Sequence, residues 1–206
     1  MKLKEALAEI RKNTEKRKFD QSVDLIVNFK GIDPKRDNVN VIANLPNKIK
    51  EKKICGFFTS KSKLVDTITE PEFIRYKDKA ALKKLVKKYD FFIAVAPLMP
   101  KVATAFGKVL GPAGKMPSPQ LGILMKEDDA QVQALLDRIS SSVKLRAKEA
   151  SLKLSVGKES MDDEKIVENV KSVYGAILNA LPNKVDNVKN IMVKLSMGKP
   201  VKTEAN

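Results

Sequence analysis

YDFFIAVAPLMPKVATAFGKVLGPAGKMPSP, residues 89–119, is the stretch that decides the fold class of this 206-residue chain. It opens with an unbroken apolar run, Phe91–Val95, which is typical of a strand buried on both faces of a parallel sheet. Pro97 and Pro100 follow, and proline suits a first helical turn because its missing N–H would have no partner there. Apolar residues then recur at helical spacing and predict a helix over 99–110: Val102, Ala105, Phe106 and Val109.

The nine residues after this predicted helix are rich in residues that interrupt regular structure. Three prolines and two glycines, Gly111 and Gly114, predict a stiff, irregular loop that holds Lys115 exposed. A Gly-Lys pair also occurs in the phosphate-binding P-loop, which reads G-x-x-x-x-G-K-[ST] between a strand and the helix it opens. Here the pair follows a helix, and Met116 stands where Ser or Thr is required. The spacing therefore excludes a P-loop.

The composition excludes several classes of protein and of site. The chain has no His and one cysteine, Cys55, so it has no internal disulfide framework and lacks the usual residues of zinc sites and His-based catalysis. No apolar run approaches the ~18–20 residues of a membrane span, and the N-terminus lacks an apolar segment of the signal-peptide kind. We therefore expect a cytoplasmic protein in a reducing setting, with no cofactor and no membrane contact.

The charge of the chain points to nucleic acid as a partner. Forty Lys and Arg residues stand against 25 Asp and Glu residues, a net charge of +15. Phosphate neutralisation and counterion release drive the binding of such proteins to nucleic acid. A lysine-rich surface kept for solubility or heat tolerance is the alternative explanation. Aromatic residues make up 5% of the chain and Trp is absent, which favours a folded RNA over a single strand that needs stacking platforms.

Alternation of apolar and polar residues marks both ends of the chain. The ranges 20–29 and 38–45 alternate, and two such strands in succession predict an antiparallel layer with one wetter face. The range 143–156 alternates with a change of parity near Ala150, which indicates a bulge, a bend or two separate strands. A last strand is predicted at 191–195. Four residues of the first strand share the inward parity: Val23, Leu25, Val27 and Phe29. Amphipathic helices are predicted at the two ends as well, over 2–17 and 162–181.

The middle of the chain has a different pattern. Compact apolar runs at 54–58 and 121–125 resemble the strand at 91–95, and helices are predicted at 78–88 and from Asp128, as N-cap, to about residue 140. Buried strands that alternate with helices indicate an open parallel α/β unit.

We therefore predict an α/β protein of two domains. A discontinuous α+β domain with an antiparallel sheet is built from both termini, 1–63 and 154–206. An open α/β, Rossmann-like domain, 64–153, is inserted into it.

The motifs resemble those of one family. Residues 98–119, LMPKVATAFGKVLGPAGKMPSP, resemble the signature of the universal large-subunit ribosomal protein number one, here the L-one family. Residues 18–46, KFDQSVDLIVNFKGIDPKRDNVNVIANLP, are similar to its first strand pair, and residues 154–170, LSVGKESMDDEKIVENV, are similar to its second crossing into the end-built domain. The likeness covers nearly the whole chain, and DFFIAVAPLMP, residues 90–100, is closest to archaeal members.

The resemblance implies which residues contact RNA. In the family these contacts come from a strand that begins K-F-[TD]-x-[TS] and from a T-M-G-P sequence on the final strand. The matching residues, with Lys158 counted among the candidates, are Lys18, Phe19, Ser22, Lys158, Asn190, Ser196, Met197 and Gly198. Two positions depart from the pattern, because Ser196 replaces Thr and Lys199 moves the proline by one place. Two simpler explanations stay open: Phe19 as a core residue, and Met197-Gly198 as the plain end of a strand.

The resemblance also implies the function. Family members bind large-subunit ribosomal RNA, form the mobile stalk of the large ribosomal subunit and help release deacylated tRNA from the exit site. They also repress translation by binding their own messenger RNA. We expect this chain to do the same, to be ribosome-bound in the cytoplasm, and to be a monomer when free.

Two other functions remain as alternatives. The first is a phosphate-handling enzyme that uses Lys115, but no carboxylate pair, His or activated nucleophile converges in the sequence to support it. A module that binds ribosomal proteins without RNA is the second alternative.

Overall fold

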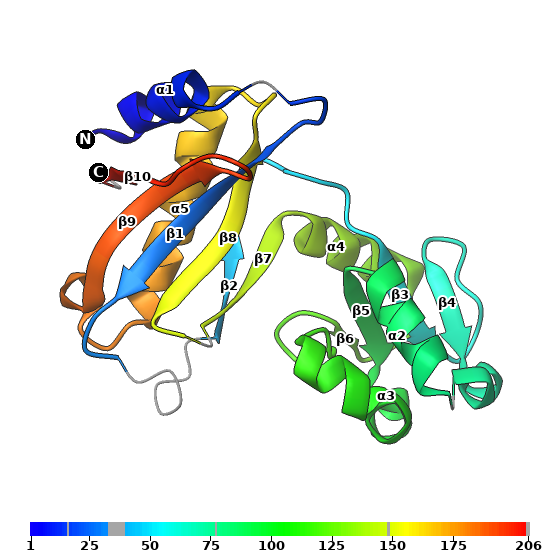
Figure 1. Ribbon diagram of the computed structural model, residues 1–206. Helices are drawn as coiled ribbons and strands as arrows, with labels where there is room; N and C mark the ends of the chain where they lie inside the picture. Colours follow the sequence, from blue (N-terminus) through cyan, green and yellow to red (C-terminus); the bar gives the residue numbers. More distant parts are fainter. Residues whose placement is uncertain (16, 33–39, 77, 148, 205–206) are drawn as a thin grey trace. The chain divides into compact units, whose positions relative to one another are not determined.

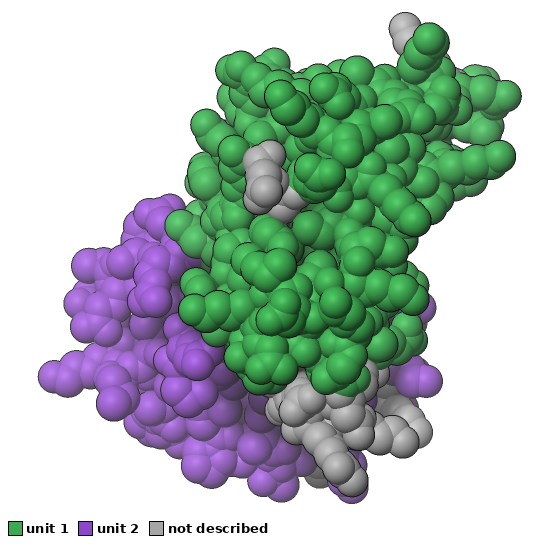
Figure 2. Space-filling view, turned by 90° about the vertical axis from the view of Figure 1, so that its left-hand side faces the viewer, with its two compact units in different colours: residues 1–49, 141–206 green, residues 50–140 purple. Residues whose placement is uncertain are grey.

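The computed structural model describes residues 1–15, 17–32, 40–76, 78–147 and 149–204 (Figure 1). The first two residues of the strand predicted over 38–45 lie outside this part of the chain. Two compact units are present, shown in different colours in Figure 2. Unit 1 consists of Met1–Ile49 and Ser141–Asn206, and unit 2 is Lys50–Ser140.

Unit 1 is built on an antiparallel sheet in the order β10-β9-β1-β8. Its strands are β1 (Ser22–Phe29), β8 (Ser151–Lys158), β9 (Val188–Leu195) and β10 (Val201–Thr203). A separate antiparallel pair is formed by β2 (Asn40–Asn44) and β7 (Ser142–Arg146). The helices are α1 (Leu3–Asn13) and α5 (Asp163–Ala180), with the short helix η3 (Lys184–Asn187) before β9. The predicted antiparallel sheet is confirmed, but β1 pairs with β8 and β9, not with the next strand in sequence.

One face of the four-stranded sheet packs against both helices. The four residues predicted to point inward from β1 are all buried, and the apolar stripes of α1 and α5 join them in one core (Figure 1). Alternate residues of β1 are half-buried, so the opposite face of the sheet is not covered by these helices. The change of parity near Ala150 corresponds to two separate strands, β7 and β8. The short strand β10 was not predicted, because three residues are too few to show alternation.

Unit 2 is built on a parallel sheet in the order β4-β3-β5-β6. Its strands are β3 (Ile54–Phe58), β4 (Asp66–Thr69), β5 (Phe91–Val95) and β6 (Ile123–Leu124), and its helices are η1 (Glu70–Tyr76), α2 (Lys79–Lys88), η2 (Ala96–Leu98), α3 (Met99–Ala113) and α4 (Asp129–Ser140). The prediction of buried parallel strands from their apolar runs is confirmed. In the core, the ring of Phe57 lies 5.7 Å from that of Phe92 and 4.9 Å from that of Phe106.

The bounds of the two units differ from the domain limits expected from the sequence. Residues 50–63 lie in unit 2, since β3 pairs with β4 and β5 there. Residues 141–153 lie in unit 1, where β7 pairs with β2. Strand pairing between distant segments sets these bounds, and periodicity carries no information about it.

The prediction of an irregular loop over 111–119 is wrong for its first three residues, which are helical, and wrong in exposing Lys115, whereas residues 114–119 are irregular as expected. Helix α3 continues through Gly111 and Pro112 to Ala113, and Gly114 (φ 72°) ends it in the left-handed conformation. Proline in a last turn removes one hydrogen bond but has a helical φ. The ammonium of Lys115, which is half-buried, donates to the carbonyl oxygens of Val86 and Tyr89, each at 2.8 Å. These carbonyls close α2, where no intrahelical N–H reaches them, so Lys115 caps a neighbouring helix.

Replacing this lysine tests its structural role. Lys115→Met keeps most of the side-chain volume but leaves the carbonyls of Val86 and Tyr89 without their donor. We expect the free energy of unfolding to fall by about 1–3 kcal/mol, the range for hydrogen bonds to charged groups. Urea unfolding measures this, with Lys108→Met on the exposed surface of α3 as the control. Equal stability of both variants and the wild type would contradict the capping role.

Candidate nucleic-acid interface

Three chain segments meet at one end of the four-stranded sheet: the start of β1, the turn after β8 and the turn after β9 (Figure 1). In the ladder, Ser22 pairs with Lys158 on one side, and the N–H of Ser196 donates to the carbonyl of Ser22 on the other (3.1 Å). Candidates near the N-terminus and the C-terminus therefore come together in the fold, although Ser22 and Ser196 are 174 residues apart in the sequence.

The hydroxyl of Ser196 joins β9 to β1. Its oxygen accepts the N–H of Ser22 (3.2 Å), and its proton is directed at the carbonyl of Ser22 (3.3 Å). A hydroxyl has one donor and two acceptor positions, so one acceptor stays available for a group such as a ribose 2′-OH.

Two large apolar side chains project into solvent at this end. Phe19 is 54% exposed and Met197 is 65% exposed, so Phe19 is not a core residue. The N–H of Met197 donates to Oε1 of Gln21 (3.3 Å), and Phe19 precedes Gln21 by two residues, so both exposed residues adjoin the start of β1. Exposed apolar patches on soluble proteins mark surfaces for binding.

Gly198, in the turn after β9, lies against the end of α1. A Cβ at Gly198 would lie 2.6 Å from Oγ1 of Thr14, the residue that ends α1. The close approach that requires glycine is therefore made by this protein's own helix end. Gly198 also donates its N–H to Leu195 (2.9 Å) and so closes the turn that presents Met197.

The cationic candidates differ in their surroundings. The ammonium of Lys158 lies 3.7 Å from Oδ2 of Asp20, and Asp20 also accepts the hydroxyl of Ser160 at 2.9 Å. Lys18 is exposed and forms no ion pair with the described residues. Lys18 is thus available for a phosphate, whereas Lys158 would share its charge with Asp20.

Asn190 lies on the same uncovered face but not at the same end. It pairs with Asn28, whose amide donates to it at 2.7 Å. Six residues along a strand correspond to about 20 Å, so Asn190 and Ser196 mark the two ends of a strip along β1 and β9. We call this strip, from Ser196 to Asn190, the open strip.

Comparison with known sequences identifies the family of the chain. Residues 11–199 match the profile of the Ribosomal protein L1p/L10e family. The chain belongs to this family. Relatives named large ribosomal subunit protein uL1 include that of Archaeoglobus fulgidus, 34% identical over 98% of this chain and 96% of its own length. The proteins of Cenarchaeum symbiosum (93% and 91%) and Thermoplasma acidophilum (98% and 96%), which have the same name, are each 36% identical.

In this L1-family protein, the middle of the open strip contains residues that the motifs did not reveal. Asp24 pairs with Lys194, and Ile26 pairs with Met192. Their only signal in the sequence is the outward parity of the ranges 20–29 and 191–195. They offer a carboxylate, an ammonium and an apolar patch between Ser196 and Asn190, so the strip has acceptors and donors along its length.

Burial perturbs the carboxylate of this strip. Burial raises the pKa of Asp24, and the charge of Lys194 acts in the opposite direction. Since the folded-state pKa of Asp24 lies above the unfolded value, the charged carboxylate lowers the stability of the protein at neutral pH. Protonation of Asp24 removes this cost, and the stabilisation by protonation is complete only below the ordinary pKa of 3.8.

We expect Asp24→Asn to raise the free energy of unfolding at about pH 7, with the gain shrinking toward about pH 4. Urea unfolding across this range measures it, and a gain that is equal at both pH values would contradict the explanation.

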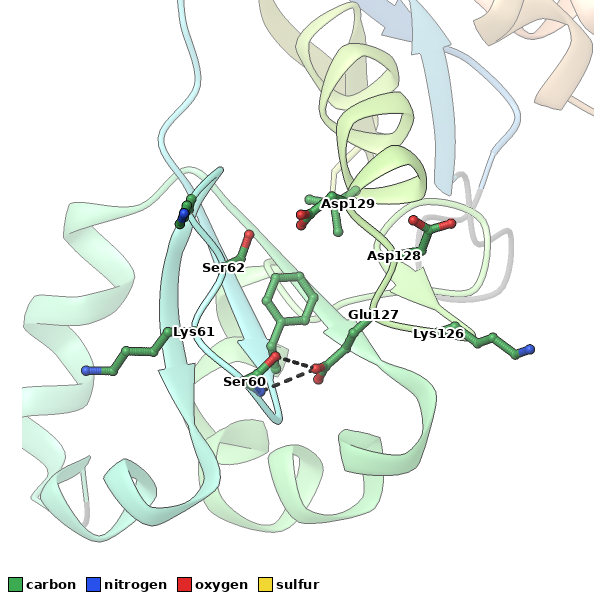
Figure 3. Close-up of a pocket in the computed structure, with 10 residues that line it drawn as sticks. Ser60, Lys61, Ser62, Lys126, Glu127, Asp128 and Asp129 are labelled. Carbon is green, nitrogen blue, oxygen red and sulfur yellow. Dashed lines mark hydrogen bonds between the residues drawn. The ribbon is translucent and has the colours of Figure 1, made fainter.

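Unit 2 contains a pocket of about 730 Å³ beyond the carboxyl ends of β3 and β6 (Figure 3). Ligands of parallel sheets bind at this edge, which makes the pocket the natural place for catalysis. Glu127 accepts hydrogen bonds from the N–H (3.3 Å) and hydroxyl (2.9 Å) of Ser60 and also from the N–H of Thr59. Burial acts to raise its pKa, but these hydrogen bonds outweigh burial and hold the pKa below its usual value. Glu127 is therefore a charged residue whose hydrogen bonds connect the loop after β6 to the loop after β3.

The other groups of the pocket do not form a reactive site. Asp128 caps α4 through the N–H of Ala130 (3.3 Å), and Lys61 and Lys126 point away from the pocket (Figure 3). Cys55 does not line the pocket, and burial, with smaller contributions from nearby charges, raises its pKa to about 12, which favours the unreactive thiol over the thiolate. Within the described ranges, no group of His, Cys, Asp and Glu could hold a metal ion, and no helix is long and apolar enough to cross a membrane. The L1 family is structural and not enzymatic.

Proposed function

We propose that this chain is a structural component of the large ribosomal subunit in the cytoplasm and binds large-subunit ribosomal RNA with the open strip and its Ser196 end. The observation that supports this most strongly is that Ser22 is hydrogen-bonded to Ser196 and Gln21 to Met197, which joins the two ends of the chain at the segments that carry the exposed Phe19 and Met197. Phe19 and Met197 are exposed, and the hydrogen bonds between Ser22 and Ser196 connect the two segments that carry them.

The chemistry of the strip suits a folded RNA. Lys18 and Lys194 supply charge for phosphates, while Ser196, Asp24 and Asn190 supply acceptors for ribose hydroxyls. The apolar surfaces of Phe19 and Met197 can pack on sugars or bases. A flat, partly apolar strip about 20 Å long matches the wide, shallow minor groove of an RNA helix better than the narrow major groove.

The finer functions rest on the resemblance to the family. We propose that the chain helps to form the mobile stalk and to release deacylated tRNA from the exit site. We also propose that it represses translation by binding its own messenger RNA. A messenger that folds like the ribosomal site would occupy the same strip, so the two RNAs should compete.

Binding measurements test the proposal. We expect tight, salt-dependent binding of a stalk-region fragment of large-subunit RNA and much weaker binding of an unrelated duplex of equal length. Affinities for both RNAs at several salt concentrations separate specific recognition from general attraction. Equal affinities at every salt concentration would reject specific recognition by this chain. Addition of the messenger leader to the complex tests repression, since a leader that does not displace the fragment does not share the strip.

A further inference from the structure

Gln21 is a fully buried polar residue at the centre of the proposed interface. Its side chain is 0% exposed, whereas its neighbours Phe19 and Ser22 are accessible or half-buried. Buried amides are costly unless they are hydrogen-bonded. The hydrogen-bond partners of the Gln21 amide therefore indicate its role.

The amide and backbone of Gln21 connect three chain segments. Oε1 accepts the N–H of Met197 (3.3 Å), and Nε2 donates to Oε2 of Glu159 (3.2 Å). The backbone carbonyl of Gln21 also accepts the N–H of Glu159 (2.7 Å). Gln21 thus joins the start of β1 to the turn after β9 and to the turn after β8.

Each of these segments carries side chains of the proposed interface. Phe19 precedes Gln21 by two residues and Ser22 follows it directly. Lys158 precedes Glu159, and Met197 is the exposed residue of the turn after β9. The bonds of the amide end on residues that lie just beyond the paired strands, where the ladder no longer sets the backbone position. Together with the backbone bonds of Ser196 and Gly198, the amide therefore fixes the Met197 turn against the start of β1.

We infer that Gln21 is a positioning residue for RNA recognition: its buried amide holds the Met197 turn and the Lys158 turn against the start of β1, so that the exposed side chains present one surface. The inference rests on the proposed function, because it assumes that this surface binds RNA. Gln21 itself does not touch the RNA.

The first test replaces the amide by a group of similar shape. Gln21→Met should lower affinity for the stalk-region RNA fragment about tenfold, the order of effect of one lost hydrogen bond. The matched control is Asn169→Leu. Asn169 is equally buried, lies on α5 at the covered face and bonds to Asn47 and Val156, so its replacement should lower stability and leave affinity unchanged. Affinities are compared at a temperature where circular dichroism shows each variant to be folded.

A second pair of variants tests the geometry without removing polarity. Gln21→Glu keeps an acceptor for Met197 but sets two carboxylates against each other at Glu159, and it should weaken binding. The exchanged double variant, Gln21→Glu with Glu159→Gln, restores one donor between the two positions and should regain affinity. This rescue does not depend on whether Gln21→Met folds. A double variant no better than Gln21→Glu alone would overturn the inference.

A double-mutant cycle provides the readout that a merely stabilising residue would not change. If Gln21 positions Met197, then Met197→Ala should cost less affinity in the Gln21→Met background than in the wild type. Fully additive losses would overturn the inference. A wild type that binds the fragment no better than an unrelated duplex would instead reject the proposed function, so the two failures are distinct.

Discussion

Replacing Phe19 and Met197 together by alanine should weaken binding of the stalk-region RNA fragment by about 2–3 kcal/mol, or roughly 30- to 150-fold in the dissociation constant. Phe19 is 54% exposed and Met197 is 65% exposed, so most of their apolar surface is free to contact RNA. In a complex, they would pack on sugars and bases and exclude water around the polar contacts. Truncation removes that contact and leaves the charge of the protein unchanged.

The stability of this variant separates binding from folding. Because both side chains are mostly exposed, the free energy of unfolding should change by no more than about 0.5 kcal/mol. The matched control is Ile74→Ala with Met125→Ala, two apolar residues of unit 2 that are 67% and 79% exposed. Titration of each protein with the RNA fragment measures the effect. A loss of affinity that is equal in both double variants would show that exposed apolar surface acts without regard to place.

Phe57→Ala should destabilise unit 2 by about 3–5 kcal/mol, the usual cost of removing a buried ring. Phe57 is fully buried and contacts the rings of Phe73, Phe92 and Phe106 at centroid distances of 5.8, 5.7 and 4.9 Å. An alanine would leave a cavity among these rings. Thermal unfolding followed by circular dichroism measures the loss.

The same variant tests how far RNA recognition depends on unit 2. We propose that recognition lies in unit 1, so Phe57→Ala should retain most of its affinity for the fragment under conditions where unit 1 is folded. Leu25→Ala, which removes a buried residue from the core of unit 1, is the matched control and should lower affinity by loosening β1. If Phe57→Ala loses as much affinity as Leu25→Ala, then recognition does not lie in unit 1 alone.

Lys115 shows why a side chain's partner is hard to predict. Its neighbours Gly114 and Pro117 indicate a turn, and a turn is found, but the ammonium ends at the carbonyls of α2, 26 and 29 residues earlier. Whether a lysine at a turn points to solvent or caps another helix depends on how two helices pack. A local pattern contains no information on that packing.

The candidate interface was predictable in part. The motif positions Ser22 and Ser196 are hydrogen-bonded to each other, Met197 bonds to Gln21 beside Ser22, and the exposure of Phe19 agrees with a contact role more than a core role. Asp24, Lys194 and Gln21 were not identified. Asp24 and Lys194 become partners only through the register of β1 and β9, and Gln21 matters only because two turns approach it.

The sequence by itself determined the class of structure, the inward and outward faces of β1, the buried strands of the parallel sheet and the family. These features depend on local periodicity and on motifs, both of which are carried by neighbouring residues. The tertiary structure alone decided which strands pair, where unit 2 begins and ends, what Lys115 and Gly198 contact, and that Gln21 lies between three segments of the interface. Such features depend on contacts between residues far apart in the chain, and these contacts exist only after the termini have folded together.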